Sequence, residues 1–371
     1  MAWQKWHIRG ELSVRPVFAL AFIAILLGSP QPARSDTHIP PDDPAIFYSP
    51  YNWAVSDVAA VSINPGAYFR TMFAGNTAVL NFDAKLMGSP ASQIWWRVDD
   101  KNWHKAVVAS AIPLSIPDET KAATFHTLEV IFKSEDITLN RWNTDAVGTA
   151  VKFTGLSLDA GATVHAPALL PCNLLIFGDS IAEGVRTVGE SAVIATDDND
   201  SRAGWAYRAG EMLGCEVGVV GFGGQGYAAN TAVGGVPQFF NSFGLIYAGN
   251  PRNFSPAPDL VVVSFFNDRF TADADVTADA TLALNGILAA TPSATKVVVL
   301  EALPAIWPAN TRTAVHKAVT DIGSPRLIWQ LTTGIFNTAN GSDSLSVHPT
   351  GQNNQLQIAP KLAALLRAYL P

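Results

Sequence analysis

The stretch Leu174-Leu-Ile-Phe-Gly-Asp-Ser-Ile-Ala-Glu-Gly184 decides the fold of the second half of the chain. Its first four residues are apolar, as in a short buried strand, and Gly178 marks the end of that strand. Asp179 and Ser180 then fall on the turn that follows. Open α/β sheets bind their ligands at this position, beyond the carboxyl ends of the strands. The sequence therefore predicts that Ser180 stands where a nucleophile would act.

From this stretch to the end of the chain, apolar strand-like runs alternate with helical patterns. Such alternation is typical of βαβ units, which build a parallel sheet. We predict strands at 173–177, 216–220, 259–265, 296–300 and 326–330. We predict helices at 203–213, 277–290, 309–322 and 351–369, with a kink in the last at Pro360. Residues 169–371 are therefore expected to form an α/β domain with a five-stranded parallel sheet.

Residues 36–168 contain short β-type runs separated by turn signals. The clearest runs are 78–82, 93–98, 127–132 and 150–153. Regular short strands with turns between them favour a β-sandwich domain. The proline-containing segment 166–171 is the predicted linker to the second domain.

The first 35 residues have the features of a signal peptide. Lys5, Arg9 and Arg15 form a basic segment, residues 16–28 form an apolar one, and Ala33-Arg34-Ser35 resembles a cleavage site. We expect residues 1–35 to be removed and the protein to be secreted or periplasmic. An uncleaved N-terminal anchor is the alternative. Because the apolar segment is short for a span, no integral membrane span is expected after the signal is removed.

The charge balance restricts the partners. The chain has 24 basic and 31 acidic residues, and removal of the signal takes away four Lys/Arg and one Glu, which leaves a net charge of −10. This charge argues against nucleic acid or an anionic membrane surface as a partner. The acidic loop 197–200 has oxygen ligands of the type that Ca²⁺ prefers, but a solvated loop is favoured, and no metal site is predicted. We expect a two-domain monomer.

Four short blocks carry the residue types of acyl transfer. Ser180 would attack an ester carbonyl, and His348 would take the serine proton and return it to the leaving alkoxide. The developing oxyanion needs fixed donors. The backbone N–H groups of Ser180 and Gly224 and the side-chain amide of Asn267 would supply them. Glycine suits position 224 because the main chain must come close to the substrate.

The blocks resemble those of the SGNH, or GDSL, hydrolase superfamily. The resemblance covers residues 172–371 and rests on Gly178-Asp-Ser180, Gly221-Phe-Gly-Gly-Gln-Gly226, Asn267-Asp268 and His348-Pro349. It implies a flavodoxin-like α/β fold and acyl-enzyme chemistry without a metal or organic cofactor. It also implies that Asp179 and Asp268 brace the loops by hydrogen bonding.

The chain departs from the family pattern at two positions. Phe265 stands where the third block usually has glycine. Leu345 stands where the family usually has an aspartate, three residues before the histidine. The nearest acid is Asp343, five residues before His348. Either Asp343 reaches the imidazole or a main-chain carbonyl orients it, and Asp343 is the residue we predict.

A β-sandwich in front of an SGNH domain resembles carbohydrate esterase family 2, whose members remove acetyl groups from polysaccharides. The resemblance implies an acetylated glycan, or another ester, as the substrate. Trp307, after the fourth predicted strand, is a candidate to line the acyl site. Tryptophans of the first domain offer either a sugar-stacking platform or core packing, which is favoured for most of them: Trp53, Trp95, Trp96, Trp103 and Trp142.

Three other functions stay open at this point. The chain could be a lipase, lysophospholipase or thioesterase of the same superfamily, or a sugar O-acetyltransferase that passes the acyl group to a sugar. It could also be a non-catalytic carbohydrate-binding protein. The complete set of Ser180, Gly224, Asn267 and His348 argues against this last function.

Cys172 and Cys215 are candidates for a disulfide. In this superfamily the first two strands are parallel neighbours, and each cysteine lies just before one of them. Neighbouring strands are about 4.8 Å apart, and a disulfide accepts Cα separations of roughly 4.4 to 6.8 Å. An oxidising compartment would allow the bond. Two buried free thiols are the alternative, if the side chains face opposite sides of the sheet.

Overall fold

The computed structural model describes residues 36–190, 195–229, 231–301, 303, 309–336, 342–343 and 347–371. The predicted signal peptide and Trp307 lie outside these residues, as does Leu345. In the described part of the chain, no helix is long and apolar enough to cross a membrane.

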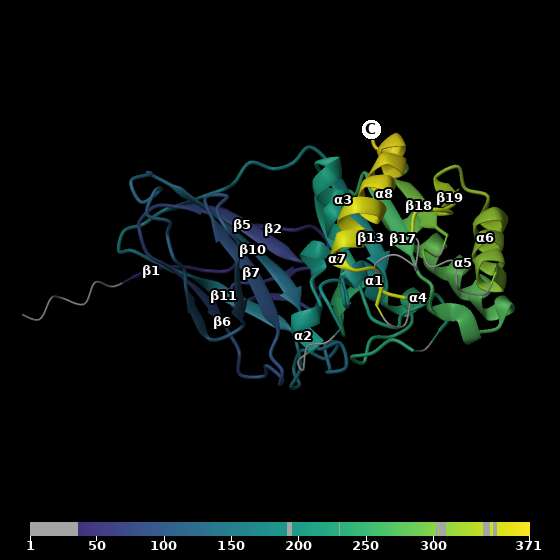
Figure 1. The fold of residues 1–371 in the computed structure, drawn as a ribbon, viewed down its shortest axis with the longest axis horizontal. Coiled ribbons are helices and arrows are strands. Elements are labelled where there is room, and N and C mark those ends of the chain that lie inside the picture. Colours follow the sequence, from purple (N-terminus) through teal and green to yellow (C-terminus); the bar gives the residue numbers. More distant parts are fainter. Residues whose placement is uncertain are drawn as a thin grey trace, which may run out of the picture. The chain divides into compact units, whose positions relative to one another are not determined.

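The first half of the described chain forms two antiparallel sheets that face each other as a β-sandwich (Figure 1). One sheet has the order β3 (Ala54–Val55), β4 (Ala60–Ser62), β11 (Val151–Leu158), β6 (Ala78–Phe82) and β9 (Ala111–Pro113), with β1 (Thr37–Ile39) beside β11. The other has the order β12 (Val164–His165), β5 (Tyr68–Phe73), β10 (His126–Ser134), β7 (Gln93–Val98) and β8 (His104–Val107), with β2 (Phe47–Tyr48) beside β5. The alternating apolar residues of both sheets fill one core, which confirms the predicted sandwich.

The second half builds the predicted parallel sheet. Its five strands have the order β14 (Glu216–Gly221), β13 (Asn173–Gly178), β17 (Leu260–Ser264), β18 (Lys296–Leu300) and β19 (Leu327–Gln330). The chain leaves β13 for β14 on one side and then returns to β17 on the other. Such a reversal makes the carboxyl end of β13 a topological switch point, where α/β proteins bind ligands. The turn that carries Ser180 follows at this point.

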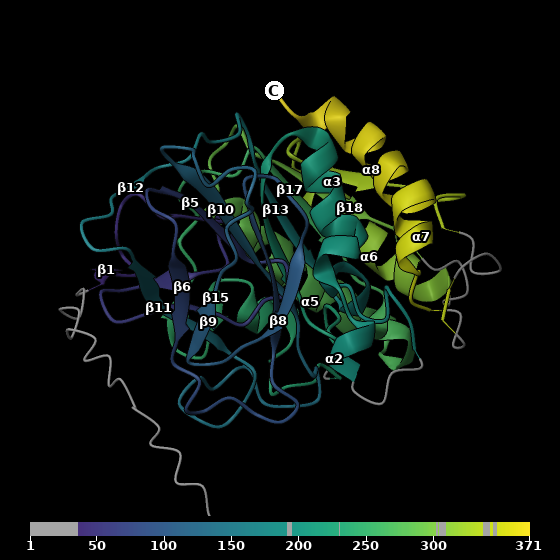
Figure 2. The same cartoon turned by 60° about the vertical axis from the view of Figure 1, so that its left-hand side comes forward.

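Helices cover both faces of the parallel sheet. Alternate residues of β13 point to opposite faces, so Leu174 and Ile176 pack with α3 (Trp205–Leu213) and α8 (Ala359–Leu366). Leu175 and Phe177 pack with α5 (Asp273–Ala290) and α6 (Ala309–Ile322) on the other face. Figure 2 shows α3 and α8 side by side. The doubly covered sheet explains why the central residues of its strands are mostly apolar, while polar residues such as Asn173 and Lys296 stand at the strand starts.

The last predicted helix is interrupted. It begins as α7 (Gly351–Asn353), widens into a π-helical turn at Asn354–Ile358, and continues as α8 and a 3₁₀ turn at Arg367–Tyr369. Pro360 lies in the first turn of α8 and has no N–H to donate. A π turn directly before it accommodates this missing donor.

The sandwich and the parallel sheet share an extensive interface, and residues 36–371 form one compact unit. Tyr68 and Ile131 of the sandwich belong to the same buried cluster as α3 and β14. The Tyr68 hydroxyl donates to Glu216 Oε2 at 2.5 Å, and Arg70 pairs with the same carboxylate. The segment 166–171 lies between β12 and β13. A domain boundary at residue 168 stays a prediction.

The predicted disulfide is present. Cys172 and Cys215 are bonded, with their Cα atoms 4.6 Å apart. The register explains the match, because Asn173 pairs with Glu216 and the two preceding cysteines therefore lie level at the amino ends of β13 and β14.

Candidate active site

The turn after β13 places Ser180 at the start of a short helix, α1 (Ser180–Glu183). Asp179 caps this helix by accepting a hydrogen bond from Ile181 N at 3.0 Å. Gly178 allows the turn, because a Cβ at that position would lie 2.5 Å from the Cβ of Ala182. Gly184 ends the helix with φ of +89°. Gly178 before this helix and Gly184 after it thus permit a tight strand–turn–helix around Ser180.

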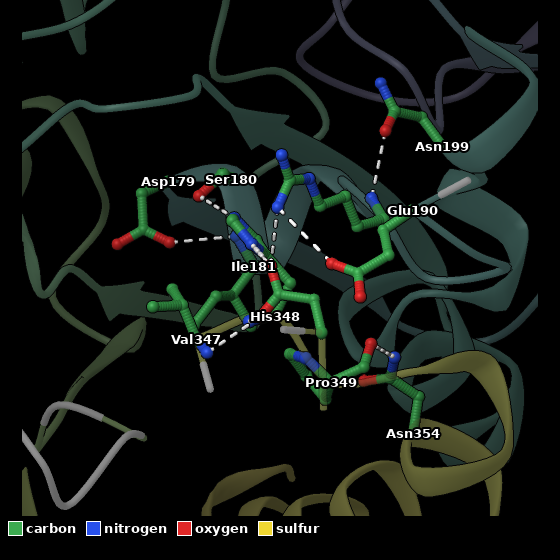
Figure 3. Close-up of polar contacts among 11 residues, drawn as sticks. Asp179, Ser180, Ile181, Glu190, Asn199, Val347, His348, Pro349 and Asn354 are labelled. Atoms are coloured by element: carbon green, nitrogen blue, oxygen red, sulfur yellow. Dashed lines mark hydrogen bonds and ion pairs between the residues drawn. The ribbon is translucent and has the colours of Figure 1, made fainter. Parts of the chain in front are cut away.

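Ser180, His348 and Asp343 form a continuous hydrogen-bonded chain (Figure 3). The distance between Ser180 Oγ and His348 Nε2 is 2.9 Å, and that between His348 Nδ1 and Asp343 Oδ2 is 2.8 Å. Of the two groups considered for orienting the imidazole, it is thus the Asp343 carboxylate that lies at Nδ1. Nucleophile, base and orienting acid in this arrangement can perform acyl transfer.

Hydrogen bonds between Asp343 and the residues at and before His348 hold the carboxylate beside the ring. Asp343 Oδ1 accepts hydrogen bonds from Val347 N at 2.9 Å and His348 N at 3.1 Å. In return, Asp343 N donates to the carbonyl of His348 at 2.9 Å. On the far side of the histidine, Asn354 Nδ2 donates to Pro349 O at 3.0 Å (Figure 3). The segment that carries His348 is therefore fixed at both ends.

The environment of Asp343 favours its ionised form. Burial alone would raise the pKa of this carboxyl, but the hydrogen bonds from the His348 ring and from the Val347 and His348 amides lower the pKa well below its usual value. Arg186 adds an ion pair, with its Nη1 3.1 Å from Asp343 Oδ2. Arg186 could not be identified from the sequence, because a partner 157 positions away in the chain leaves no local pattern.

The predicted oxyanion groups Gly224 and Asn267 lie on loops that follow the strands on either side of β13. Gly178 pairs with Gly221 on one side and with Ser264 on the other, so the strands end together. Gly224 follows Gly221 with φ of +76°, and a Cβ there would lie 2.3 Å from the carbonyl oxygen of Thr231. The position therefore requires glycine.

Asn267 begins a 3₁₀ turn, Asn267–Phe270, directly after β17. Its Nδ2 donates to Gln225 O at 3.0 Å, which ties the asparagine to the loop of Gly224. A primary amide has a second N–H, which suits it to an oxyanion hole. Phe265, the departure from the family pattern, packs against Phe239 and Tyr227 with ring centroids 4.6 and 5.2 Å away. The replacement fills the core and leaves Asn267 at the strand end.

Asp179 and Asp268 brace the loops, as expected. Asp179 also accepts from Phe266 N at 3.0 Å, and so joins the Ser180 turn to the Asn267 turn. Asp268 accepts from the amides of Tyr227, Ala228 and Ala229 at 2.8 to 2.9 Å. Burial raises the pKa of both carboxyls, and the amide hydrogen bonds oppose that shift. The three blocks are therefore held together by buried side-chain–main-chain contacts.

The acidic segment 197–200 begins within α2 (Ala195–Asp198) and is only partly exposed to solvent, which corrects the favoured interpretation of a solvated loop. Asn199 and Asp200 are buried, whereas the Asp197 side chain is 38% exposed. Lys133 Nζ, on β10, donates to the carbonyls of Thr196 and Asn199 at 2.8 and 2.6 Å. Burial lowers the pKa of this lysine to about 8. Asp197 accepts from Lys105 Nζ at 2.8 Å. Lysines thus supply positive charge to this loop. In the described residues, no three His, Cys, Asp or Glu side chains are grouped as metal ligands.

The tryptophans of the sandwich are mostly engaged in packing. Trp53 and Trp96 belong to its buried core, and Trp142 contacts Phe222. Trp95 donates to Asp200 Oδ2 at 3.0 Å. Trp103 lies between two guanidinium groups, those of Arg97 and Arg202, at 4.6 and 4.7 Å. These contacts favour the core-packing interpretation over a stacking platform.

The chain has the fold of the family two carbohydrate esterases. It matches such an esterase from Cellvibrio japonicus with a TM-score of 0.72 and 17% identity, over 90% of this chain and 99% of that chain. An acetyl xylan esterase, Est2A from the rumen bacterium Butyrivibrio proteoclasticus, gives 0.70 and 12%, over 90% and 98%. A family two carbohydrate esterase from Clostridium thermocellum in complex with cellohexaose gives 0.68 and 18%, over 88% and 100%. These matches confirm the predicted architecture.

Comparison of the sequence alone does not detect this similarity. No protein-family model matches the chain, and no curated protein matches it. In the sequence the resemblance is limited to the four short blocks, whereas in the structure it extends over the whole fold.

Proposed function

We propose that this protein is an exported serine esterase that removes acetyl groups from a polysaccharide or oligosaccharide. The observation that carries the proposal is the hydrogen-bonded chain Ser180–His348–Asp343 at the switch point of the parallel sheet, in the fold of the family two carbohydrate esterases. Export is inferred from the features of residues 1–35, so the place of action is the periplasm or the outside of the cell.

In the proposed reaction, His348 Nε2 removes the proton of Ser180 Oγ as the oxygen attacks the acetyl carbonyl. The tetrahedral oxyanion is stabilised by the N–H groups of Ser180 and Gly224 and by the Asn267 amide. As the ester bond breaks, the imidazolium returns its proton to the sugar alkoxide, which leaves as an alcohol. A water molecule then attacks the acetyl-serine with His348 as base, and acetate leaves.

Asp343 has the role of an orienting and stabilising group. Its carboxylate fixes the tautomer of His348 with the proton on Nδ1, which frees Nε2 to accept from the serine. Because the carboxylate stays ionised, it also stabilises the imidazolium that forms in each half of the reaction.

The glycan assignment rests on the relatives. The solved structures with this fold include an acetyl xylan esterase and an esterase in complex with cellohexaose. The net negative charge of the chain is consistent with a neutral sugar as substrate.

Two measurements on the mature chain test the function. Rates on p-nitrophenyl esters from acetate to octanoate report acyl length, and acetate release from acetylated xylan and glucomannan reports the glycan. We expect a preference for acetate and release of free acetate from at least one polysaccharide. A preference for octanoate favours a lipase-type function, and acetyl transfer to an added sugar without free acetate favours an O-acetyltransferase. Absence of turnover on every ester overturns the enzymatic proposal.

A further inference from the structure

A fully buried ionic cluster joins the sandwich to the active-site loops. It consists of Arg141, Glu135 and Glu183, whose side chains are 0%, 0% and 2% exposed. Arg141 and Glu135 come from the segment between β10 and β11, while Glu183 is the last residue of α1. The only local sign of the cluster in the sequence is Glu183, the one ionisable residue after Ser180 in the stretch 174–184.

The cluster contacts the loop of Gly224 directly. Arg141 Nη1 lies 2.5 Å from Glu135 Oε1 and 2.9 Å from Glu183 Oε1. The other oxygen of Glu183, Oε2, accepts a hydrogen bond from Gly223 N at 2.8 Å. Glu183 therefore links the helix of the proposed nucleophile to the residue that precedes the proposed oxyanion glycine.

The main chain beside Arg141 holds the far end of the same loop. Arg141 N and Trp142 N donate to Gly234 O at 3.0 and 3.3 Å, and Val233 N donates to Gly223 O at 3.0 Å. Gly234 has φ of +72°, and a Cβ there would lie 2.9 Å from Arg141 Cγ. One end of the loop is thus held by Glu183, the ion-pair partner of Arg141, and the other end by the main chain of Arg141 itself.

Because the three side chains of the cluster are charged and buried, its structure depends on the presence of every one of them. Two carboxylates face one guanidinium in the interior, and burial raises the pKa of Glu135 to about 8 and also raises that of Glu183, against the effect of Arg141. The cluster is then nearly neutral when it holds one proton. Removal of one partner from such a group leaves a buried charge without compensation.

We propose that Arg141 and Glu183 are positioning residues for the oxyanion hole, through which the N-terminal sandwich takes part in catalysis. The inference rests on the proposed function, because it assigns Gly224 to the stabilisation of the oxyanion. Oxyanion donors act in the transition state and not in the bound ester, so a displaced loop lowers kcat with little change in KM.

The test compares two buried arginines. Arg141→Met removes the cluster cation, and Arg252→Met is the matched control. Arg252 is 5% exposed and donates to the carbonyls of Tyr51 in the sandwich and of Phe243 and Leu245 in the second half. Its guanidinium also lies over the ring of Phe177, 5.6 Å from the centroid, but among the described residues its hydrogen bonds go to none of the active-site blocks. Both variants lose a buried guanidinium that connects the two halves.

Rates are expressed per active site, titrated with a fluorophosphonate that forms a P–O bond with Ser180 and releases fluoride. We expect Arg141→Met to lower kcat on p-nitrophenyl acetate about 10- to 100-fold with KM within threefold of wild type. Arg252→Met should lower the melting temperature with kcat per titrated site within twofold of wild type. Equal kcat values for the two variants overturn the positioning role.

A second variant covers the case in which Arg141→Met does not fold. Glu183→Gln keeps the shape of the side chain and an oxygen for Gly223 N, but removes the charge. We expect kcat to fall several-fold with KM unchanged, and a wild-type kcat overturns the inference. If wild-type protein reacts with neither the titrant nor the ester, the proposed function fails, and this inference fails with it. If wild type reacts and turns over normally, an unaffected variant contradicts the positioning role alone.

Discussion

Ser180 and His348 meet through one hydrogen bond of 2.9 Å between residues 168 positions apart in the chain. We expect Ser180→Ala to lower kcat by several orders of magnitude, because the variant has no oxygen to form the acyl-enzyme. His348→Ala should have an effect of similar size, since the serine then lacks its base. The measurement is kcat on p-nitrophenyl acetate with purified protein, and circular dichroism controls for folding. Substantial turnover by folded Ser180→Ala would remove Ser180 from the mechanism.

The role of Asp343 decides whether the site works as a Ser-His-Asp triad or as a Ser-His dyad whose imidazole another group orients. The carboxylate lies 2.8 Å from His348 Nδ1 and is held ionised by its hydrogen bonds. We expect Asp343→Asn to lower kcat by about 10²- to 10⁴-fold, because the amide favours the wrong tautomer and does not stabilise the imidazolium. Steady-state rates at pH 7 to 8 test this expectation. A kcat within a few-fold of wild type would leave the orienting role to another group.

Some residues of the candidate site could be predicted from the sequence and others could not. Ser180, Gly224, Asn267 and His348 were identified because each belongs to a short block next to a strand or helix end. Asp343 stayed one of two alternatives, since no local sequence pattern fixes the distance between its carboxylate and the His348 ring. Arg186 was not found at all, because its contact with Asp343 joins distant parts of the chain.

Among the helices and strands, the bounds of the five parallel strands could be predicted to within one or two residues. In β13, β14, β17 and β18 the apolar runs are buried, and they end at or next to glycine or polar residues, so the strand ends are visible in the sequence. Helix α5 begins at Asp273, four residues before the predicted start, because its first three residues, Asp273-Ala-Asp275, are exposed and add no apolar periodicity before the buried Val276. Pro360 predicts a kink in the last helix, and the structure has a π turn just before it, at Asn354–Ile358. A proline in the sequence indicates that a helix is interrupted but not the form of the interruption.

The disulfide between the starts of β13 and β14 gives an element-scale prediction. It closes a loop of 43 residues, which should stabilise the fold by about 4 kcal/mol through the entropy of the unfolded chain. We expect the variant Cys172→Ala/Cys215→Ala to have a free energy of unfolding lower by about this amount, with kcat unchanged at temperatures where it is folded. Urea unfolding of both proteins measures the difference.

Reduction of the wild type provides the control for that experiment, because it opens the bond without changing side-chain volume. Reduced wild type and the double variant should unfold at similar urea concentrations. Equal stability of oxidised and reduced wild type would contradict the expected contribution of the bond.

At the scale of the whole molecule, the two halves of the chain depend on each other. Tyr68 and Ile131 of the sandwich are buried against the second half, the partly exposed Arg70 pairs with Glu216, and residues 36–371 form one compact unit. The two fold types could be predicted from their different periodicities. The contacts between them could not, because a buried pair such as Arg141 and Glu183 involves residues from both halves.

The ionic cluster should make the stability of the whole unit depend on pH. Burial, together with the charge of Glu183, raises the pKa of Glu135 to about 8, although Arg141 opposes the shift. In the unfolded chain a glutamate has a pKa of about 4.3. Between these two values the folded protein binds more protons than the unfolded one. The stabilising contribution is therefore complete at pH values below about 4 and is lost as the pH rises through about 8.

Glu135→Gln tests this dependence, because the amide keeps the volume and the acceptor for the Thr149 hydroxyl but cannot titrate. We expect the free energy of unfolding of wild type, relative to the variant, to fall by up to about 1.4 kcal/mol per pH unit between pH 5.5 and 8. Urea unfolding at several pH values measures it. Asp118→Asn, at a surface acid, is the control and should show a constant difference from wild type over this range. A constant difference for Glu135→Gln as well would mean that the cluster holds no extra proton, and that its two carboxylates are both ionised beside Arg141.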